Sequence, residues 1–192
     1  RRAFIVEVMG RHSGYLAMRA GIAADADAIL YAEQHSSEDD IVARLRELLK
    51  RSFSEERGKK RVLIIKAEGV QVPTARLVER LGAHLAEDVP GVGIRETILG
   101  HVVRGGSPSA LDRLIAQRLA LGAVLSLEQG AHDVMLAWEP PAGIGAPTLD
   151  PSVVAVPLAQ VLEETARMLD GTSEMTAGRV ALLEAYGNLL AL

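Results

Sequence analysis

Apolar positions along the chain repeat with two different spacings, and stretches of the two kinds follow one another. Short β-branched runs predict strands over 3–9, 28–31, 62–66, 94–100 and 134–138. Apolar residues at helical spacing predict helices over 14–24, 39–57, 73–87, 110–127, 157–170 and 174–190. Strands that alternate with helices of this length imply βαβ units. We therefore predict an α/β fold, a mostly parallel sheet with flanking helices in three layers.

Signals at the ends of these segments support the assignment. Ser36 or Ser37 is placed to cap the helix over 39–57, whose first turn is acidic, and Gly58 follows its end. Pro73 stands at the start of the next helix, where proline is tolerated. The proline- and glycine-rich stretch 139–151 predicts a loop.

The first residues indicate that the chain is part of something longer. Arg1 and Arg2 lead directly into an apolar strand run, without an initiator Met. We interpret the chain as a piece of a longer polypeptide whose amino-terminal part is absent. The predicted fold is incomplete to that extent.

Composition excludes several classes of function. A length of 192 residues allows one domain or two small lobes. The formal net charge of −4 argues against a nucleic-acid binder, and Cys 0 excludes disulfides, thiolate zinc sites and a cysteine nucleophile. No apolar stretch is long enough to cross a bilayer, and no basic-then-apolar leader is present. We expect a cytoplasmic protein that binds neither nucleic acid nor membranes.

Polar groups follow four of the predicted strands in turn. They are Met9-Gly10-Arg11-His12, Glu33, Glu68-Gly69, and His101 with Arg104. In open parallel sheets, ligands bind beyond the carboxyl ends of the strands. Cationic groups there suit a phosphate, and a carboxylate suits hydroxyl groups. Each residue also has a structural explanation: Arg11 follows a tight turn at Gly10, and Glu68 is typical of a solvated loop.

The segment from Thr97 to Pro108 carries the most specific pattern. An apolar run ends at His101 and Arg104 beside two glycines, ahead of the helix predicted over 110–127. Backbone amides, the helix dipole and a guanidinium group would converge there on one small anion. A strand-to-helix turn that requires glycines explains the same residues. The five histidines show no ligand spacing, so we predict no metal site within the chain.

Two segments resemble the fructose-6-phosphate-binding segments of 6-phosphofructokinases. They are Val6-Glu7-Val8-Met9-Gly10-Arg11-His12-Ser13-Gly14-Tyr15, and Leu99-Gly100-His101-Val102-Val103-Arg104-Gly105-Gly106-Ser107-Pro108 with Asp112 and Arg113. The resemblance extends to about Trp138 and implies two α/β lobes with the substrate between them. It assigns residues 1–103 to the sugar-phosphate-binding lobe, 104–150 to the donor-binding lobe, and 151–192 to carboxy-terminal helices.

The resemblance also implies roles for individual residues. Met9, Gly10 and Arg11 would contact the sugar phosphate, and Arg11 would stabilise the transferred phosphoryl group. Glu68 would accept hydrogen bonds from sugar hydroxyls, while His101 and Arg104 would hold the 6-phosphate.

Two further sets match residues of the bacterial enzymes. Arg2 and Arg95 correspond to arginines that reach a neighbouring subunit's phosphate, so a homo-oligomer, usually a tetramer, is implied. An effector-binding region would comprise Glu33, Arg57, Gly58, Lys59 and Lys60. There the segment Tyr31-Ala32-Glu33 departs from the usual Pro-Glu ending.

The family's glycine-rich donor loop, Gly-Gly-Asp segment and Thr-Ile-Asp segment with the catalytic base do not occur in the chain. The resemblance thus implies the carboxy-terminal part of a 6-phosphofructokinase, a glycolytic kinase that phosphorylates the 1-hydroxyl of fructose 6-phosphate. Mg²⁺ with ATP would be bound mainly by the absent amino-terminal half, and the fragment alone would be inactive. Three alternatives are a pyrophosphate-dependent enzyme, a non-catalytic, sugar-phosphate-binding regulatory subunit, and a related sugar or nucleoside kinase with a different acceptor.

Overall fold

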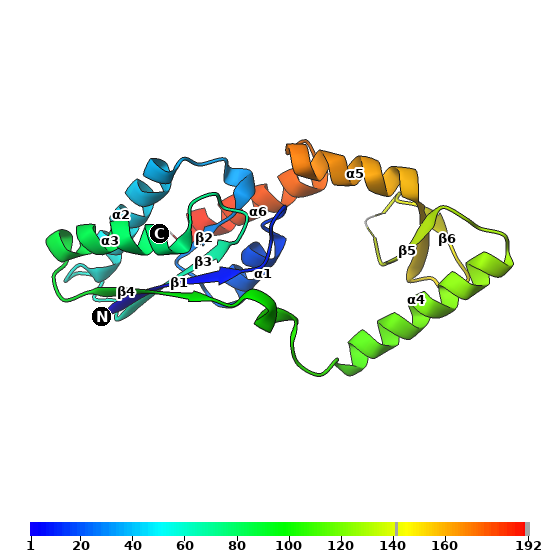
Figure 1. Ribbon diagram of the computed structural model, residues 1–192, viewed down its shortest axis with the longest axis horizontal. Coiled ribbons are helices and arrows are strands. Elements are labelled where there is room, and N and C mark those ends of the chain that lie inside the picture. The colour runs from blue at the N-terminus through cyan, green and yellow to red at the C-terminus, as the bar shows by residue number, and fades with distance from the viewer. Residues whose placement is uncertain (141, 191–192) are drawn as a thin grey trace. The chain divides into compact units, whose positions relative to one another are not determined.

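The computed structural model describes residues 1–140 and 142–190, and residues 141, 191 and 192 of the predicted loop and terminal segment lie outside the described residues. The chain divides into two compact units, coloured along the sequence in Figure 1. Unit 1 comprises Arg1–Gly105 together with helix α6 (Glu174–Leu190). Unit 2 comprises residues Gly106–Ser173.

Within the described residues, unit 1 is built on a four-stranded parallel sheet. Its strands are β1 (Arg2–Val8), β2 (Ala28–Leu30), β3 (Arg61–Ala67) and β4 (Gly93–Ile98), in the order β2-β3-β1-β4. In this register Glu7 lies opposite Lys66 on one side and Ile98 on the other. The predicted α/β fold with a parallel sheet is confirmed.

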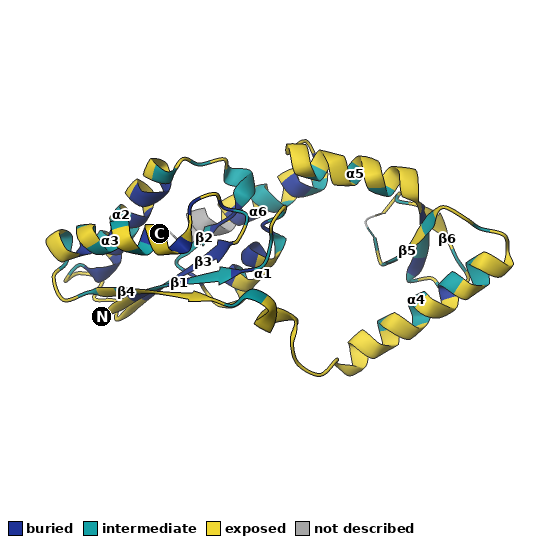
Figure 2. Cartoon of the chain, viewed as in Figure 1, coloured by how far each residue is buried: buried dark blue, intermediate teal, exposed yellow. Residues whose placement is uncertain are grey.

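Helices cover both faces of this sheet. Helices α2 (Glu38–Phe53) and α3 (Thr74–Asp88) bury an apolar core with Ile5 and Ile64. Helix α1 (Tyr15–Ala23) packs on the other face, where Val8 and Ile65 point, because successive strand residues alternate between faces. Helix α6 adds Leu183 against Met18 of α1 and Tyr31. Figure 2 shows these buried positions in dark blue.

Several element ends differ from the sequence-based prediction. Ser37 is the residue that caps α2, with its Oγ accepting a hydrogen bond from the Asp40 amide at 3.2 Å. Helix α2 ends at Phe53 rather than at Arg57, and the turn after it closes where the Gly58 amide donates to the Ser54 carbonyl. Strand β4 ends at Ile98, because Gly100 takes a positive φ of 50° and a 3-10 helix, Gly100–Arg104, follows.

Unit 2 has a small antiparallel sheet between two helices. It consists of α4 (Ala110–Glu128), β5 (Val134–Trp138), β6 (Ala146–Pro147), β7 (Val153–Pro157) and α5 (Leu158–Asp170). The strand order is β5-β7-β6, with both pairs antiparallel. The sequence prediction missed β6 and β7, since a two-residue strand within a loop and a run beside a helix start carry too few positions to show a period.

The compact units cut across the predicted third segment, 151–192. Helix α5 counts with unit 2 and α6 with unit 1, because α6 packs on α1 through Leu183. The assignment of segments 1–103 and 104–150 to a sugar-phosphate-binding lobe and a donor-binding lobe stays a prediction.

Candidate functional site

The segments that follow β1, β3 and β4 leave the sheet of unit 1 at a single edge. All three strands run parallel, so their carboxyl ends lie together. The Glu68 amide donates to the Val8 carbonyl at 3.0 Å, and the Leu99 amide donates to the Glu7 carbonyl at 3.0 Å. The structure therefore brings residues 9–11, Glu68 and the 3-10 helix Gly100–Arg104 to the same edge.

Two glycines allow the first two of these segments to touch. The Gly69 amide donates to the Gly10 carbonyl at 3.1 Å. A Cβ on Gly69 would lie 2.4 Å from the Arg11 carbonyl oxygen, and one on Gly10, whose φ is +142°, would lie 2.4 Å from the Ser13 carbonyl oxygen. A larger residue at Gly69 would push the Glu68 loop away from the Arg11 loop, whereas one at Gly10 would strain the turn between Gly10 and Ser13 within the Arg11 loop itself.

The polar side chains at this edge are exposed and have no partners among the other described residues. Arg11, Glu68, His101 and Arg104 are all exposed, and no other described residue forms a hydrogen bond or ion pair with their side chains. The edge thus offers guanidinium and imidazole donors together with a carboxylate acceptor. Such groups can bind a phosphate and the hydroxyls next to it without breaking an existing pair.

Arg2 lies at the opposite end of the sheet from this edge, and Arg95 lies midway along β4. Arg2 opens β1 opposite Gly93, and Arg95 pairs with Phe4, so both side chains belong to the same face of neighbouring strands. Six residues separate Arg2 from Val8, or about 20 Å at the usual rise of a strand. The structure does not bring these two exposed arginines to the Arg11 edge of their own chain.

The residues of the predicted effector region are also divided between the two ends. Glu33 follows β2, and both of its carboxylate oxygens accept from the Gly14 amide at the start of α1, at 2.8 and 3.1 Å. The basic cluster, which consists of Arg57, Lys59 and Lys60 with Gly58 between them, precedes β3 at the amino ends of the strands. There Lys59 pairs with Asp27, whose carboxylate also accepts from the Leu63 amide at 2.9 Å. The acid beside the basic cluster is therefore Asp27, which the sequence did not single out, and not Glu33.

Sequence reasoning also missed a buried charge pair directly beneath the edge. The Lys66 ammonium lies 3.0 Å from the Glu7 carboxylate, and the Thr74 hydroxyl donates to the same oxygen. Burial is the largest influence on the pKa of Glu7 and raises it, but the hydrogen bonds from Thr74 and Lys66 and the Lys66 charge bring the pKa below its ordinary value. The sequence signal that could have revealed this pair is the presence of Glu7 and Lys66 inside otherwise apolar strand runs.

The amino end of α4 is occupied by its own side chains. Ser109 Oγ accepts from the Asp112 amide at 3.1 Å, and the Asp112 carboxylate accepts from the Ser109 amide at 2.7 Å. This capping box satisfies donors that the sequence analysis assigned to a bound anion. The Ser109 and Asp112 amides are therefore not available to a bound anion, contrary to the expectation from the sequence.

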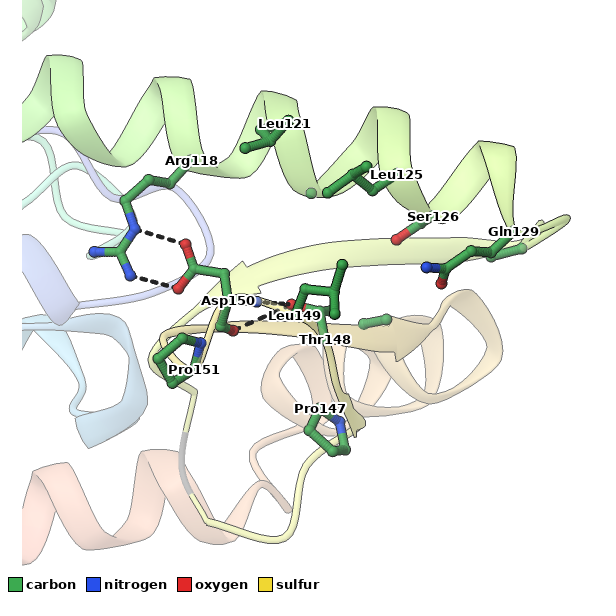
Figure 3. A pocket seen from close by; sticks show the side chains of 13 residues that line it. Arg118, Leu121, Leu125, Ser126, Gln129, Pro147, Thr148, Leu149, Asp150 and Pro151 are labelled. Carbon is green, nitrogen blue, oxygen red and sulfur yellow. Dashed lines mark hydrogen bonds and ion pairs between the residues drawn. The ribbon is translucent and has the colours of Figure 1, made fainter.

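A hollow of about 440 Å³ lies in unit 2 between α4 and the β6–β7 segment (Figure 3). Its main polar groups bind each other: Arg118 Nε lies 2.6 Å from an Asp150 oxygen, and the Arg118 guanidinium stacks 4.5 Å from the Trp138 ring centre. The rest of the lining includes Leu121 and Leu125. The hollow thus presents mainly apolar surface.

Neither a metal-binding cluster nor a membrane-spanning helix occurs among the described residues. No group of three or more His, Cys, Asp and Glu side chains there is placed to hold a metal ion, so these residues do not fit a Mg²⁺ site. None of the helices in the described part of the chain is both long and apolar enough to span a bilayer.

Comparison with known sequences finds phosphofructokinases. The sequence model described as Phosphofructokinase matches residues 1–127. The ATP-dependent 6-phosphofructokinase of Streptococcus suis (strain 05ZYH33) is 39% identical over 166 residues, 86% of this chain and 43% of that protein. Its counterpart in Bacillus cereus (strain B4264) is 43% identical over 129 residues, 67% of this chain and 37% of that protein. The chain spans about two fifths of the length of these relatives.

Solved structures of similar fold are also phosphofructokinases. Pichia pastoris phosphofructokinase in the T-state has a TM-score of 0.72 and 28% identity, covering 93% of this chain and 20% of that one. Saccharomyces cerevisiae phosphofructokinase has a TM-score of 0.68 and 26% identity, covering 97% and 25%. A pyrophosphate-dependent phosphofructokinase from Nitrosospira multiformis, with 21% identity and a TM-score of 0.58, shares the fold over 83% of this chain and 40% of that one.

The contact between the two loops predicts a specific effect on stability. Replacing Gly69→Ala forces a methyl group against the Arg11 and Gly10 carbonyl oxygens, and we expect a loss of about 1–3 kcal/mol in the free energy of unfolding. Gly82→Ala is the control, because its Cβ would meet only Ile94, at 3.6 Å, and alanine favours the helix. Urea denaturation measures both. Equal midpoints for the two variants would contradict the close approach.

The half-buried Glu7 carboxylate predicts a dependence of stability on pH. Because the pKa of Glu7 is lower in the folded chain, its contribution to stability is complete above the ordinary glutamate pKa and is lost as pH falls through the folded value. We expect the free energy of unfolding to fall more steeply between about pH 5 and pH 3 in the wild type than in Glu7→Gln. Denaturant titrations at a series of pH values measure both slopes, and parallel curves would show that Glu7 is not stabilised as an anion.

Proposed function

The chain belongs to the phosphofructokinase family, and on that premise we propose that it forms the fructose-6-phosphate-binding part of an ATP-dependent 6-phosphofructokinase. The complete enzyme transfers a phosphoryl group to the 1-hydroxyl of the sugar phosphate, as a cytoplasmic enzyme of glycolysis. ATP as donor follows the names of the relatives at 39% and 43% identity. The observation that carries the proposal is the meeting of unpaired Arg11, Glu68 and the His101–Arg104 segment at one edge.

Each group at this edge has a distinct role in the proposal. His101 and Arg104 hold the 6-phosphate, since a dianion gains about 1.5–3 kcal/mol from each charge-assisted hydrogen bond. Glu68 accepts hydrogen bonds from sugar hydroxyls. Met9 and Gly10 border the sugar phosphate, where the absence of a side chain at Gly10 leaves the backbone accessible, and Arg11 neutralises charge on the phosphoryl group during transfer.

The remaining parts of the reaction lie, in this proposal, outside the chain. The catalytic base, the nucleotide and Mg²⁺ are held by the rest of the enzyme, since the chain spans about two fifths of the length of its relatives. Unit 2 supports this division, because α4 exposes large apolar side chains along its length. Those more than 45% exposed are Leu111, Leu114, Leu121, Val124 and Leu127. A helix that is apolar on most sides is normally covered in the complete protein.

Arg2 and Arg95 are assigned to a neighbouring subunit. Both are exposed, Arg2 at the first residue of β1 and Arg95 midway along β4, so each precedes the edge that carries Arg11. In a homo-oligomer, which we propose to be a tetramer, they reach the phosphate bound by the adjacent copy. The basic residues 57–60 are proposed as the effector-binding side of the same assembly.

The phosphate contact is tested by Arg104→Ala. Loss of one charge-assisted bond predicts a decrease of roughly 10- to 150-fold in affinity for fructose 6-phosphate, measured by isothermal titration calorimetry. Arg51→Ala is the matched control, since Arg51 is an exposed arginine on α2, away from the edge, and its affinity should equal that of the wild type. Unchanged affinity in Arg104→Ala would remove the proposed contact.

The division of labour predicts that the 192-residue chain binds fructose 6-phosphate but does not phosphorylate it. With ATP, Mg²⁺ and fructose 6-phosphate, a coupled assay should show no turnover above background. A chain extended to the full length of its relatives is the positive control. Turnover by the 192-residue chain itself would show that the base and the donor site are within it.

A further inference from the structure

Glu7 connects the three strands that supply the candidate site. Its carboxylate accepts from Lys66 of β3 at 3.0 Å and from the hydroxyl of Thr74, the first residue of α3. Its backbone carbonyl accepts from the Leu99 amide, just beyond β4, at 3.0 Å. One residue of β1 is therefore bonded to β3, α3 and the end of β4.

The site residues follow this junction at equal spacing. Met9 comes two residues after Glu7, Glu68 two residues after Lys66, and His101 two residues after Leu99. Because only two residues separate each site segment from the junction, the position of each strand end determines where its loop lies. Any rotation or slip of the strands at Glu7 would move all three site segments relative to one another.

Stability alone does not account for charges at this place. The Lys66 side chain is 2% exposed and that of Glu7 17% exposed, so both have lost most of their hydration. Replacing a buried ion pair by apolar residues of similar size is often neutral or stabilising. What an apolar pair cannot supply is direction, because hydrogen bonds between Glu7, Lys66 and Thr74 fix distances and angles that packing leaves looser.

We propose that Glu7 and Lys66 are positioning residues, which hold the Arg11, Glu68 and His101 segments at the separation that the sugar phosphate requires; this inference rests on the proposed function. Neither residue contacts the ligand. Recognition by several groups at once is sensitive to displacements of about 1 Å, so loss of the junction lowers affinity even where the fold is kept.

The decisive variant is Glu7→Leu/Lys66→Met, which removes both charges and keeps apolar volume in the strands. We expect its unfolding midpoint in urea to equal or exceed that of the wild type, while its affinity for fructose 6-phosphate falls at least tenfold. The matched control is Arg46→Met/Asp88→Leu. That pair joins α2 to α3 through bonds of 2.6 and 2.9 Å away from the site edge, and its loss should leave affinity within twofold.

Two single variants separate positioning from folding. Glu7→Gln keeps an acceptor for Thr74 and Lys66, so it should retain affinity within about threefold. Thr74→Val removes only the hydroxyl donor at constant shape and should weaken binding at least threefold in a folded chain. If the double variant does not fold, these two variants decide the question.

The outcomes distinguish the inference from the proposed function. If the wild type shows no binding of fructose 6-phosphate by calorimetry, the proposed function fails and the inference falls with it. If the wild type binds and the folded double variant, or Thr74→Val, binds equally well, the inference alone is overturned. A loss of affinity that Glu7→Gln does not share supports positioning by directed bonds.

Discussion

The parallel pairing of β1 with β3 and β4 is the constraint on which the rest of this structure depends. It places Glu7 level with Lys66 and Ile98, so three chain segments leave the sheet at the same height. The loops after β1 and β3 can then approach closely because Gly69 has no side chain to meet the Gly10 and Arg11 carbonyl oxygens. A shift of one residue in the pairing of β1 with β3 or β4 would turn the side chains of the shifted strand to the opposite face of the sheet.

Charges at this edge form two layers with different tasks. Glu7 and Lys66 lie within the sheet and bind each other, Lys66 buried and Glu7 half-buried, and they fix the positions of the strand ends. Arg11, Glu68, His101 and Arg104 lie outside it, exposed and without partners among the described residues, and they are available for a ligand. Both layers serve the binding of an anion. The exposed donors select one ligand only when the residues beneath them fix their spacing.

Much of this arrangement could be predicted from local sequence. The parallel sheet follows from β-branched runs that alternate with helices, and the site loops follow from polar groups placed after those runs. The junction at Glu7 could not be predicted, because it depends on which residues of distant strands face each other. The same reason explains Glu33: only the folded sheet shows that it accepts from the Gly14 amide just before α1 and that Asp27 is the acid near Lys59.

The central claim is that the loops after β1, β3 and β4 together bind fructose 6-phosphate. Its most direct test is a nuclear magnetic resonance titration of the ¹⁵N-labelled chain with this ligand. The account predicts concerted amide shifts in residues 9–14, 68–70 and 100–105, with a common dissociation constant. If all three loops stay unperturbed at the highest ligand concentration while the chain is folded, or if they titrate independently, the account is contradicted.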